Sequence, residues 1–421
     1  MIRFLYTLIL ALLSPFLLFG LYKKKKGKPS FGNRWVEHFG FSPKLTSIDP
    51  PLWIHAVSVG ETIAVTPFIK RMKEKYPHQK IVLTTTTSTG AEQARKLEGL
   101  VEHRYMPLDF PFAVKGFLNR INPSQLIIVE TELWLNTLHI VHNANIPITV
   151  LNARLSQKSY EQYARYSFYT NRIVPCISNL LCQFDSDMNR FAKLGFSNDQ
   201  LTTTGSIKFD ISVSNHTLEQ GNKLRKSIGN RPVWVAASTH KGEDEIVLSA
   251  HKTILELQPN ALLILVPRHP ERFDAVGELI DKFNMHYERR SSQSNDTAEA
   301  QVYLGDTMGE LLTLIQAADI CFMGGSLLGE KVGGHNVIEP SALRKPTITG
   351  PSYYNFDEIV KQLTSVNGLV VISTKHELAE EVTNLINSPS KANALGNSAY
   401  SVYAQSKGAI DRSITPLENL F

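Results

Sequence analysis

Residues 51–76, PLWIHAVSVGETIAVTPFIKRMKEKY, set the pattern that the rest of the chain repeats. Residues 51–59 form a short apolar run, which predicts a buried strand. From Gly60 the apolar residues recur at helical spacing, which predicts a helix. Because glycine has no side chain, it allows a sharp turn between the two elements. The stretch therefore predicts one strand–helix unit of an α/β protein.

The same alternation extends along both halves of the chain. Buried strands rich in β-branched residues are predicted in the runs IVLTTTT, QLIIVE, ITVLNA and LLCQF, and again in PVWVAAST, ALLILVP, AQVYLGD, ADICFMG and PTITG. Around residues 205–218 the pattern loosens, which we interpret as a linker. Alternating strands and helices predict parallel sheets covered by helices on both faces. We therefore expect two Rossmann-like domains facing across a cleft, with ligands beyond the carboxyl ends of the strands.

The length and charge of the chain agree with this organisation. Its 421 residues suit two α/β domains. The formal net charge of +5 comes from the first 30 residues, which hold six basic side chains and no acid. The rest of the chain carries 38 basic and 39 acidic side chains. A neutral body of this kind lacks the basic footprint of a nucleic-acid-binding protein.

The N-terminal segment is predicted to be a membrane anchor. Residues 4–22 are almost wholly apolar and approach the roughly 20 residues that span a bilayer. The lysine run at 23–26 follows this segment, whereas a cleaved signal peptide carries its charge first. A lysine-rich flank favours the cytoplasmic side and anionic lipid. Pro15 and Gly20 leave open whether the anchor spans the bilayer or lies in its interface, and a buried first helix is the structural alternative.

Several chemistries have no sequence signature in this chain. Its three cysteines, Cys176, Cys182 and Cys321, form no C-x-x-C pair, which suits buried thiols in a reducing compartment. The sequence has no G-x-S-x-G elbow, no G-x-G-x-x-G fingerprint, no Walker A loop and no H-E-x-x-H. It also has no acid pair resembling the D-x-D motif of metal-dependent transferases. We therefore expect neither a metal nor a cofactor.

Acidic residues follow two predicted strands of the first half. Glu61 comes directly after residues 51–59, where it suits a general base or a first-turn acid that complements the helix dipole. Glu130 and Glu132 follow QLIIV, and two acids beyond a buried strand are costly unless solvated, paired or used. Glu130 is the better candidate for a site role, because Glu132 also suits a cap of the next helix.

In the second half, candidate phosphate-binding residues follow the predicted strands. Pro267 stiffens the turn before Arg268, which suits a phosphate or ribose partner as well as a surface arginine. Residues 307–310 have capping-box spacing, and a helix start is also an anion site. Two glycine pairs follow, in residues 324–326 and 333–336, where backbone N–H groups can approach a phosphate. Glu339 has capping-box spacing from Asn336 and also suits a ribose partner.

These motifs together resemble the Kdo transferases of lipopolysaccharide assembly, which add 3-deoxy-D-manno-oct-2-ulosonic acid (Kdo) to a lipid A precursor. The resemblance runs nearly end to end, and so many ordered motifs are specific together. The matching segments, after the apolar start, are Arg34-Trp35, Ser58–Glu61, Glu130–Trp134, Asn152–Ser156, Gly205–Asp210, Ser238–His240, Val266–Phe273, Gly305–Leu311, Gly324–Ser326 and Gly333–Asn336.

The resemblance implies a GT-B fold, a CMP-Kdo donor, a lipid IVA acceptor and metal-independent inverting transfer at the inner membrane. It implies that Glu61 is the catalytic base and that Glu130 and Lys208 stabilise the transition state. It further implies that the donor is bound by Pro267, Arg268, Met308, Gly309, Glu310, Gly324, Gly325, Ser326, Asn336, Val337, Ile338 and Glu339.

The resemblance also implies a domain plan. The anchor covers residues 1–22, an acceptor-binding domain residues 23–212 and a donor-binding domain residues 213–399. Residues 400–421 are expected to form a helix that crosses back to the first domain. Two departures from the family pattern are a longer segment at 327–332 and a valine at 337 where proline is common.

Two other classes of function remain as alternatives. One is a different GT-B enzyme, such as a UDP-sugar transferase or a sugar-nucleotide epimerase. The other is an inactive membrane-tethered binding module, whose expected signature is loss of the acids beyond the strands. The presence of Glu61, Glu130 and Glu339 argues against the second alternative.

Overall fold

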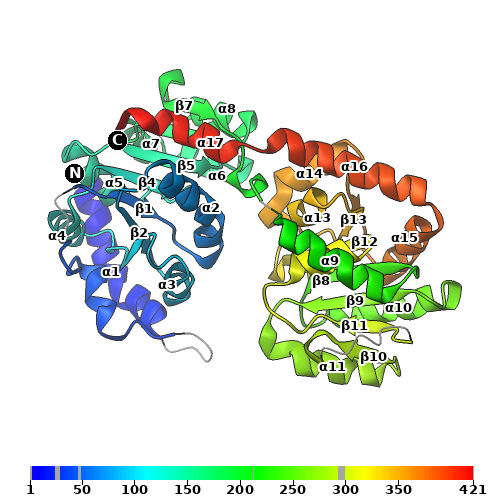
Figure 1. The fold of residues 1–421 in the computed structure, drawn as a ribbon. Helices are drawn as coiled ribbons and strands as arrows, with labels where there is room; N and C mark the ends of the chain where they lie inside the picture. Colours follow the sequence, from blue (N-terminus) through cyan, green and yellow to red (C-terminus); the bar gives the residue numbers. More distant parts are fainter. Residues whose placement is uncertain (1, 24–28, 46–48, 212, 293–298, 421) are drawn as a thin grey trace. The chain divides into compact units, whose positions relative to one another are not determined.

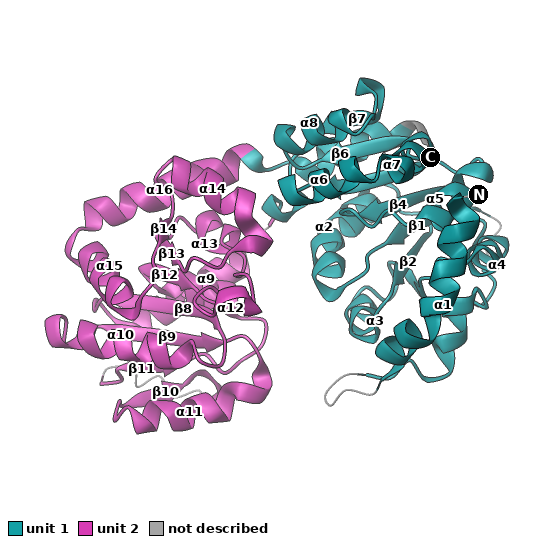
Figure 2. Ribbon diagram, turned by 180° about the vertical axis from the view of Figure 1, so that it is seen from behind, with its two compact units in different colours: residues 1–210, 406–421 teal, residues 211–405 magenta. Residues whose placement is uncertain are grey.

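The computed structural model describes residues 2–23, 29–45, 49–211, 213–292 and 299–420. The chain divides into two compact units (Figures 1 and 2). Unit 1 comprises residues 1–210 and 406–421, and unit 2 comprises residues 211–405. Each unit is an α/β body with its own parallel sheet, as the alternating sequence pattern predicts.

Unit 1 contains, among its described residues, a seven-stranded parallel sheet in the order β3-β2-β1-β4-β5-β6-β7. The strands are β1 (Leu52–His55), β2 (Ile81–Thr85), β3 (Glu102–Tyr105), β4 (Gln125–Val129), β5 (Ile148–Ala153), β6 (Asn179–Cys182) and β7 (Leu201–Thr203). The main helices are α1 (Ile2–Tyr22), α2 (Val59–Lys75), α3 (Ser88–Arg95), α4 (Pro111–Ile121), α5 (Leu135–Asn143), α6 (Gln157–Arg165), α7 (Ser167–Ile173), α8 (Asp185–Lys193) and α17 (Ala409–Ile414). Unit 1 also contains the 3₁₀ segments η1 (Gly32–Phe39) and η4 (Ile207–Phe209).

Unit 2 repeats the plan with the order β10-β11-β9-β8-β12-β13-β14 across its described strands. These strands are β8 (Val233–Thr239), β9 (Leu262–Pro267), β10 (Tyr287–Arg289), β11 (Val302–Leu304), β12 (Ile320–Met323), β13 (Thr347–Thr349) and β14 (Val370–Val371). Its helices are α9 (Asn215–Ile228), α10 (Asp244–Leu257), α11 (Phe273–Lys282), α12 (Leu311–Ala317), α13 (Ile338–Ala342), α14 (Asp357–Ser365), α15 (Lys375–Asn387) and α16 (Pro389–Ser406). In each sheet the first strand of the unit pairs with the second strand on one side and with a later strand on the other. The strands β1 and β8 therefore occupy equivalent places in the topology.

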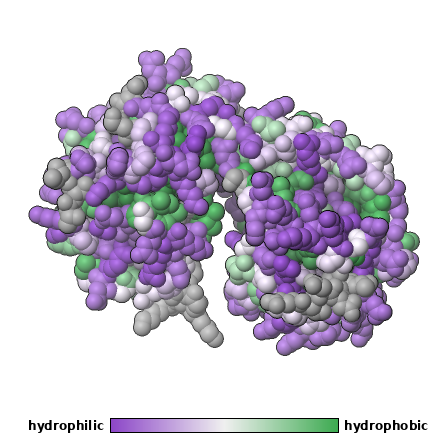
Figure 3. All heavy atoms as spheres, viewed as in Figure 1, coloured by the Kyte–Doolittle hydropathy of each residue, from purple (hydrophilic) through white to green (hydrophobic). Residues whose placement is uncertain are grey.

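Both faces of the unit 1 sheet are buried. Trp53 belongs to one hydrophobic cluster, and its neighbours Leu52 and Ile54 belong to the cluster on the other face. This alternation explains the near-continuous apolar runs of the sequence, because a strand covered on both sides needs apolar residues at every position. Most of the molecular face seen in Figure 3 is hydrophilic, and hydrophobic residues gather there in limited patches.

One sequence-based boundary is wrong, and another is sharpened. The strand expected over residues 51–59 ends at His55, because Ser58 already serves as the N-cap of α2. The linker expected around residues 205–218 contains η4 and the first turn of α9. The change of unit falls between Asp210 and Ile211.

The C-terminal residues 406–421 belong to unit 1, where α17 packs against α2. The carboxylate of Asp210 accepts hydrogen bonds from the backbone nitrogens of Gly408 and Ile410, each at 2.6 Å. Arg412 donates to the carbonyl oxygen of Thr204 at 2.9 Å. These contacts attach the end of the chain to the segment that carries η4.

Among the described helices, α1 is the one that is long and apolar enough to cross a membrane. None of its most apolar stretch is buried inside the protein. The structural alternative, a buried first helix, is therefore wrong. Polar residues near its two ends nevertheless contact unit 1. Tyr6 Oη donates to Asp109 Oδ2 at 2.9 Å, and Tyr22 Oη lies 2.8 Å from His38 Nδ1. The helix thus lies against unit 1 while its apolar side chains stay exposed.

Candidate functional site

Glu61 lies in the first turn of α2, directly beyond β1. Its carboxylate accepts hydrogen bonds from the backbone nitrogen of Val57 at 2.7 Å and from Ser58 Oγ at 2.9 Å. Ser58 Oγ in turn accepts from the backbone nitrogen of Glu61 at 3.4 Å. The acid therefore complements the helix start, as one interpretation of the sequence expected. Because the residue remains partly exposed, its carboxylate is also open to a substrate.

The environment of Glu61 favours its protonated form. Burial raises the pKa of Glu61 to about 7, and the negative charges of Glu130 and Glu132 add to the rise. The hydrogen bonds from Val57 and Ser58 oppose it. A carboxyl group that titrates near neutral pH is matched to the work of a general base.

Glu130 follows β4 with a positive φ of 62°. A non-glycine residue in this region of backbone space is strained by roughly 1–2 kcal/mol, and such strain gathers at functional sites. The backbone nitrogen of Glu130 donates to the carbonyl oxygen of Leu151 at 2.8 Å, which fixes the turn. Its Oε1 lies 3.0 Å from Lys208 Nζ. The structure therefore brings Glu61, Glu130 and Lys208 together at the carboxyl edge of one sheet.

The sequence did not single out Asn152 as a residue that positions this site. Asn152 has a φ of 59°, and its Oδ1 accepts a hydrogen bond from the backbone nitrogen of Ile207 at 3.1 Å. That bond anchors η4, the segment that carries Lys208. Glu132 is not a helix cap, contrary to one expectation. Its carboxylate accepts from Trp134 Nε1 at 3.0 Å.

In unit 2, Arg268 follows β9 and the buried Pro267. Its backbone nitrogen donates to the carbonyl oxygen of Thr239 at 3.0 Å, while the residue itself is exposed. Burial lowers the pKa of His335 to about 3, and the charge of Arg268 lowers it further. Burial raises the pKa of Glu339 to about 7, whereas Asn336 and Arg268 lower it. Arg268, His335 and Glu339 therefore share one neighbourhood.

The glycine-rich turn at 324–326 is held by Glu243, a residue whose role the sequence pattern does not predict. The fully buried carboxylate of Glu243 accepts hydrogen bonds from the backbone nitrogens of Gly325 at 2.6 Å, Ser326 at 3.0 Å and Leu327 at 3.1 Å. The expectation that these amides are open to a phosphate is therefore wrong. A Cβ at Gly324 would lie 2.7 Å from Glu243 Oε2, so the glycine is required for this approach.

A histidine pair lies beside this turn. His240 Nε2 and His335 Nε2 are 2.8 Å apart, and the planes of the two rings are within 9° of parallel. Burial lowers the pKa of His240 to about 4, so both rings are neutral at pH 7 and one donates its proton to the other. His269 packs edge-on against His240 at 5.2 Å between ring centroids. His240 and His335 each lie in a sequence motif, but the spacing of those motifs does not predict their contact.

Residues 307–310 do not form the predicted capping box. Helix α12 begins at Leu311, and Glu310 Oε1 and Oε2 accept from Arg290 at 2.7 and 3.1 Å. Thr307 donates to the carboxylate of Glu310 rather than accepting from a backbone nitrogen. Met308 is 62% exposed and Gly309 has a φ of 83°, so this turn stands open to solvent.

The second predicted capping box, from Asn336 to Glu339, is also not formed. Asn336 Oδ1 accepts from the backbone nitrogen of Ile338 at 3.1 Å, and its Nδ2 donates to Glu339 Oε1 at 3.4 Å. Val337 stands at the start of α13 with its side chain buried. The pair therefore orders the turn before α13 and aligns the Glu339 carboxyl group.

The two parallel-sheet units give the chain the GT-B fold, and the family models that match both units make it a glycosyltransferase. Solved structures with the same fold include a putative UDP-N-acetylglucosamine 2-epimerase from Listeria monocytogenes (TM-score 0.58, 10% identity, covering 88% of this chain and 96% of that chain). Another is a glycosyltransferase from Rickettsia africae (TM-score 0.57, 12% identity, covering 89% of this chain and 99% of that chain). The family model for glycosyl transferases group 1 matches residues 232–402.

The family model described as 3-deoxy-D-manno-octulosonic-acid transferase matches residues 33–211. A 3-deoxy-D-manno-octulosonic acid transferase of Haemophilus influenzae is 40% identical over 99% of this chain and 98% of its own length. One from Bordetella pertussis is 30% identical over 99% of both chains. The chain therefore belongs to the Kdo transferase family, whose members are glycosyltransferases of lipopolysaccharide assembly, as the sequence resemblance predicted.

Proposed function

We propose that this protein transfers Kdo from CMP-Kdo to lipid IVA, with inversion at the anomeric carbon and without a metal ion. The observation that carries the proposal is the cluster of Glu61, Glu130 and Lys208 at the carboxyl edge of the unit 1 sheet, in a chain of the Kdo transferase family. The pKa of Glu61, which burial raises to about 7, agrees with this role. Glu61 takes the proton of the acceptor hydroxyl as its oxygen attacks the anomeric carbon of Kdo. The bond from that carbon to the phosphate oxygen breaks, and CMP leaves.

Lys208 and Glu130 have a supporting role in the proposed reaction. Their ion pair places a cation beside Glu130, the acid whose charge acts on Glu61, and positive charge at this sheet edge stabilises a departing phosphate. The charge of Glu130 also helps to keep the pKa of Glu61 high. Glu130 thus tunes the base, and Lys208 balances the charge that develops in the transition state.

Unit 2 is proposed to bind the CMP part of the donor. Arg268 offers an exposed guanidinium for the phosphate or ribose, and Glu339 suits the ribose hydroxyls. Met308 and Gly309 offer an open turn, whereas Glu243 shapes the turn at 324–326. We accordingly assign acceptor binding to residues 23–212 and donor binding to residues 213–399.

We further propose that α1 anchors the enzyme to the cytoplasmic face of the inner membrane. The exposed apolar side chains of α1 support this placement, as does the lysine run that comes after it in the sequence. A membrane-bound acceptor is then available without leaving the bilayer. Deletion of residues 1–22 should release the protein from membranes, measured by sedimentation of vesicles.

The proposal is tested by incubating the full chain with CMP-Kdo and lipid IVA and weighing the products by mass spectrometry. The expected product is lipid IVA with one or more added Kdo residues. UDP-sugars, tried in parallel in transfer and in thermal shift, address the alternative of another GT-B enzyme, because a ligand of the native state raises the melting temperature. Transfer from a UDP-sugar with none from CMP-Kdo would overturn the proposal.

A further inference from the structure

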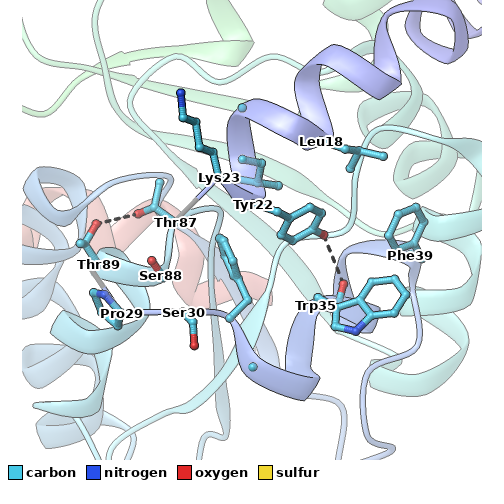
Figure 4. A pocket seen from close by; sticks show the side chains of 14 residues that line it. Leu18, Tyr22, Lys23, Pro29, Ser30, Trp35, Phe39, Thr87, Ser88 and Thr89 are labelled. Carbon is cyan, nitrogen blue, oxygen red and sulfur yellow. Dashed lines mark hydrogen bonds between the residues drawn. The ribbon is translucent and has the colours of Figure 1, made fainter. Parts of the chain in front are cut away.

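Unit 1 has a cavity of about 590 Å³ that the proposed chemistry leaves unexplained (Figure 4). Three segments contribute its lining: the end of α1 with Lys23, the stretch from Pro29 through η1 to Phe39, and the start of α3 with its N-cap Thr87. The volume falls within the roughly 300–1,000 Å³ typical of small-molecule sites. The cavity is therefore large enough for part of a substrate.

The walls of the cavity differ in chemistry. Leu18, Trp35 and Phe39 form an apolar side, and Thr87, Ser88 and Thr89 form a hydroxyl-bearing side (Figure 4). Tyr22 Oη donates to the carbonyl oxygen of Trp35 at 3.5 Å, which connects α1 to η1. A pocket with an apolar wall and a polar rim suits an amphiphile whose chain is apolar and whose head is polar.

The polar rim lies next to the strand that precedes Glu61. The backbone nitrogen of Thr86 donates to the carbonyl oxygen of Val57 at 3.3 Å. The backbone nitrogen of Val57 donates to Glu61 Oε2 at 2.7 Å. Two hydrogen bonds therefore connect the edge of the cavity to the proposed base, within unit 1 alone. Because β1 and β2 pair in parallel, a ligand with its polar head at this rim has that head at the same sheet edge as Glu61.

The apolar side of the cavity continues the exposed face of α1. Phe16 is 77% exposed and Phe19 is 69% exposed, and both lie within two residues of the lining residue Leu18 in the sequence. Exposed aromatic and leucine side chains on a helix lie in the acyl region of a bilayer interface. An acyl chain held in that region therefore lies within one helix turn of the apolar wall of the cavity.

We infer that this cavity binds an acyl chain of the lipid acceptor and so places the acceptor's sugar hydroxyl at Glu61. The inference rests on the proposed function and adds to it a site that selects acylated acceptors. Each methylene buried in such a pocket is worth roughly fourfold in affinity. An acceptor that has lost its acyl chains should therefore bind more weakly.

The experiment uses two neighbouring residues of α1 as a matched pair. Leu18 lines the cavity, whereas Leu17 is exposed and does not. Leu18→Glu and Leu17→Glu add the same charge and remove the same apolar side chain from one helix turn. The full-length enzyme is assayed in detergent micelles with lipid IVA and with the same sugar phosphate stripped of its acyl chains. Trp35→Ser provides a second cavity variant on a different segment.

For the wild type we expect a KM at least tenfold higher for the stripped acceptor than for lipid IVA. In Leu18→Glu and Trp35→Ser this ratio should fall towards one, with the KM for CMP-Kdo unchanged. Leu17→Glu should keep the wild-type ratio. A wild-type ratio in both cavity variants, or its loss in Leu17→Glu, would overturn the inference.

A phospholipid added to the micelles should not raise the KM for lipid IVA, because the ligand is the acceptor's own chain. A rise matching that of Leu18→Glu would assign the cavity to any bilayer lipid and overturn the inference. Failure of the proposed function is distinguishable, because the wild type would then transfer Kdo to neither acceptor.

Discussion

Glu61 and Glu243 occupy equivalent places in the two units, each just beyond the first strand of its sheet and at the start of the next helix. Glu61 is partly exposed and has two hydrogen-bond donors, Val57 and Ser58. Glu243 is fully buried and accepts from four backbone nitrogens, including that of His240. The same position therefore holds a partly exposed acid in one unit and a fully buried acid that fixes a backbone turn in the other.

The difference shows what a strand-edge acid needs in order to react. A carboxylate whose lone pairs are saturated by backbone donors has no capacity left for a substrate proton. A carboxylate with few donors, partial burial and acidic neighbours keeps that capacity and gains a higher pKa. Glu61 meets the second description and Glu243 the first, although the pKa of both is raised by burial.

The substitution Glu61→Gln is expected to have the largest effect on kcat. The substitution keeps the shape of the side chain and removes the base, so kcat for Kdo transfer should fall by about 10²–10⁴-fold. Glu92→Gln, on the exposed face of α3, is the control and should transfer at the wild-type rate. Both rates are measured at saturating donor and acceptor. A Glu61→Gln enzyme that retains most of its kcat would remove Glu61 from the mechanism.

Glu243→Gln should act on folding and donor binding instead. An amide cannot accept all the bonds that the carboxylate accepts, so at least one buried backbone nitrogen loses its partner, at about 1–3 kcal/mol. We expect a lower urea midpoint and a KM for CMP-Kdo about tenfold higher, in line with a loss of that size. Glu245→Gln, two residues along and exposed, is the matched control. Unchanged stability in Glu243→Gln would argue that solvent replaces those bonds.

Ser58→Ala should have a smaller, pH-dependent effect. Ser58 Oγ donates to the ionised form of Glu61, so its removal should raise the pKa of Glu61. A rise of about one pH unit would lower the rate at pH 7 by about fivefold and leave the rate at pH 9 nearly unchanged. The rates of wild type and variant are compared at both pH values. An equal loss of rate at both pH values would instead indicate that Ser58 acts by capping α2 and not through the pKa of Glu61.

The sequence was sufficient to predict the architecture and the placement of candidate site residues beyond the strands. Doubly covered parallel strands leave continuous apolar runs, and residues such as Glu61, Glu130 and Arg268 follow those runs directly. It was not sufficient for Glu243, because its partners lie 82 to 84 residues away in the chain and are backbone atoms. The sequence was also not sufficient to predict the partner of Glu310, because Arg290 pairs with it from the end of another strand.

The spacing rules failed where a tertiary partner competed with a local one. Thr307 and Glu310 have the sequence of a capping box, but the Arg290 guanidinium takes the carboxylate, and α12 starts later. Ser58 and Glu61 have the same spacing and do cap their helix, because Lys208, the cation at this edge, pairs with Glu130 instead. Local patterns are therefore reliable only where the fold brings no stronger partner to the same atoms.

The pH dependence of kcat tests the role of Glu61 most directly. The base must be ionised, so kcat of the wild type should rise with pH through an apparent pKa of about 7 and then level off. Glu339 also has a pKa of about 7, so Glu339→Gln is measured in parallel and should keep the rise. In Glu61→Gln the residual kcat should no longer rise with pH through this range. A rise that persists in Glu61→Gln, or a wild-type rise centred near the ordinary glutamate pKa, would contradict this account.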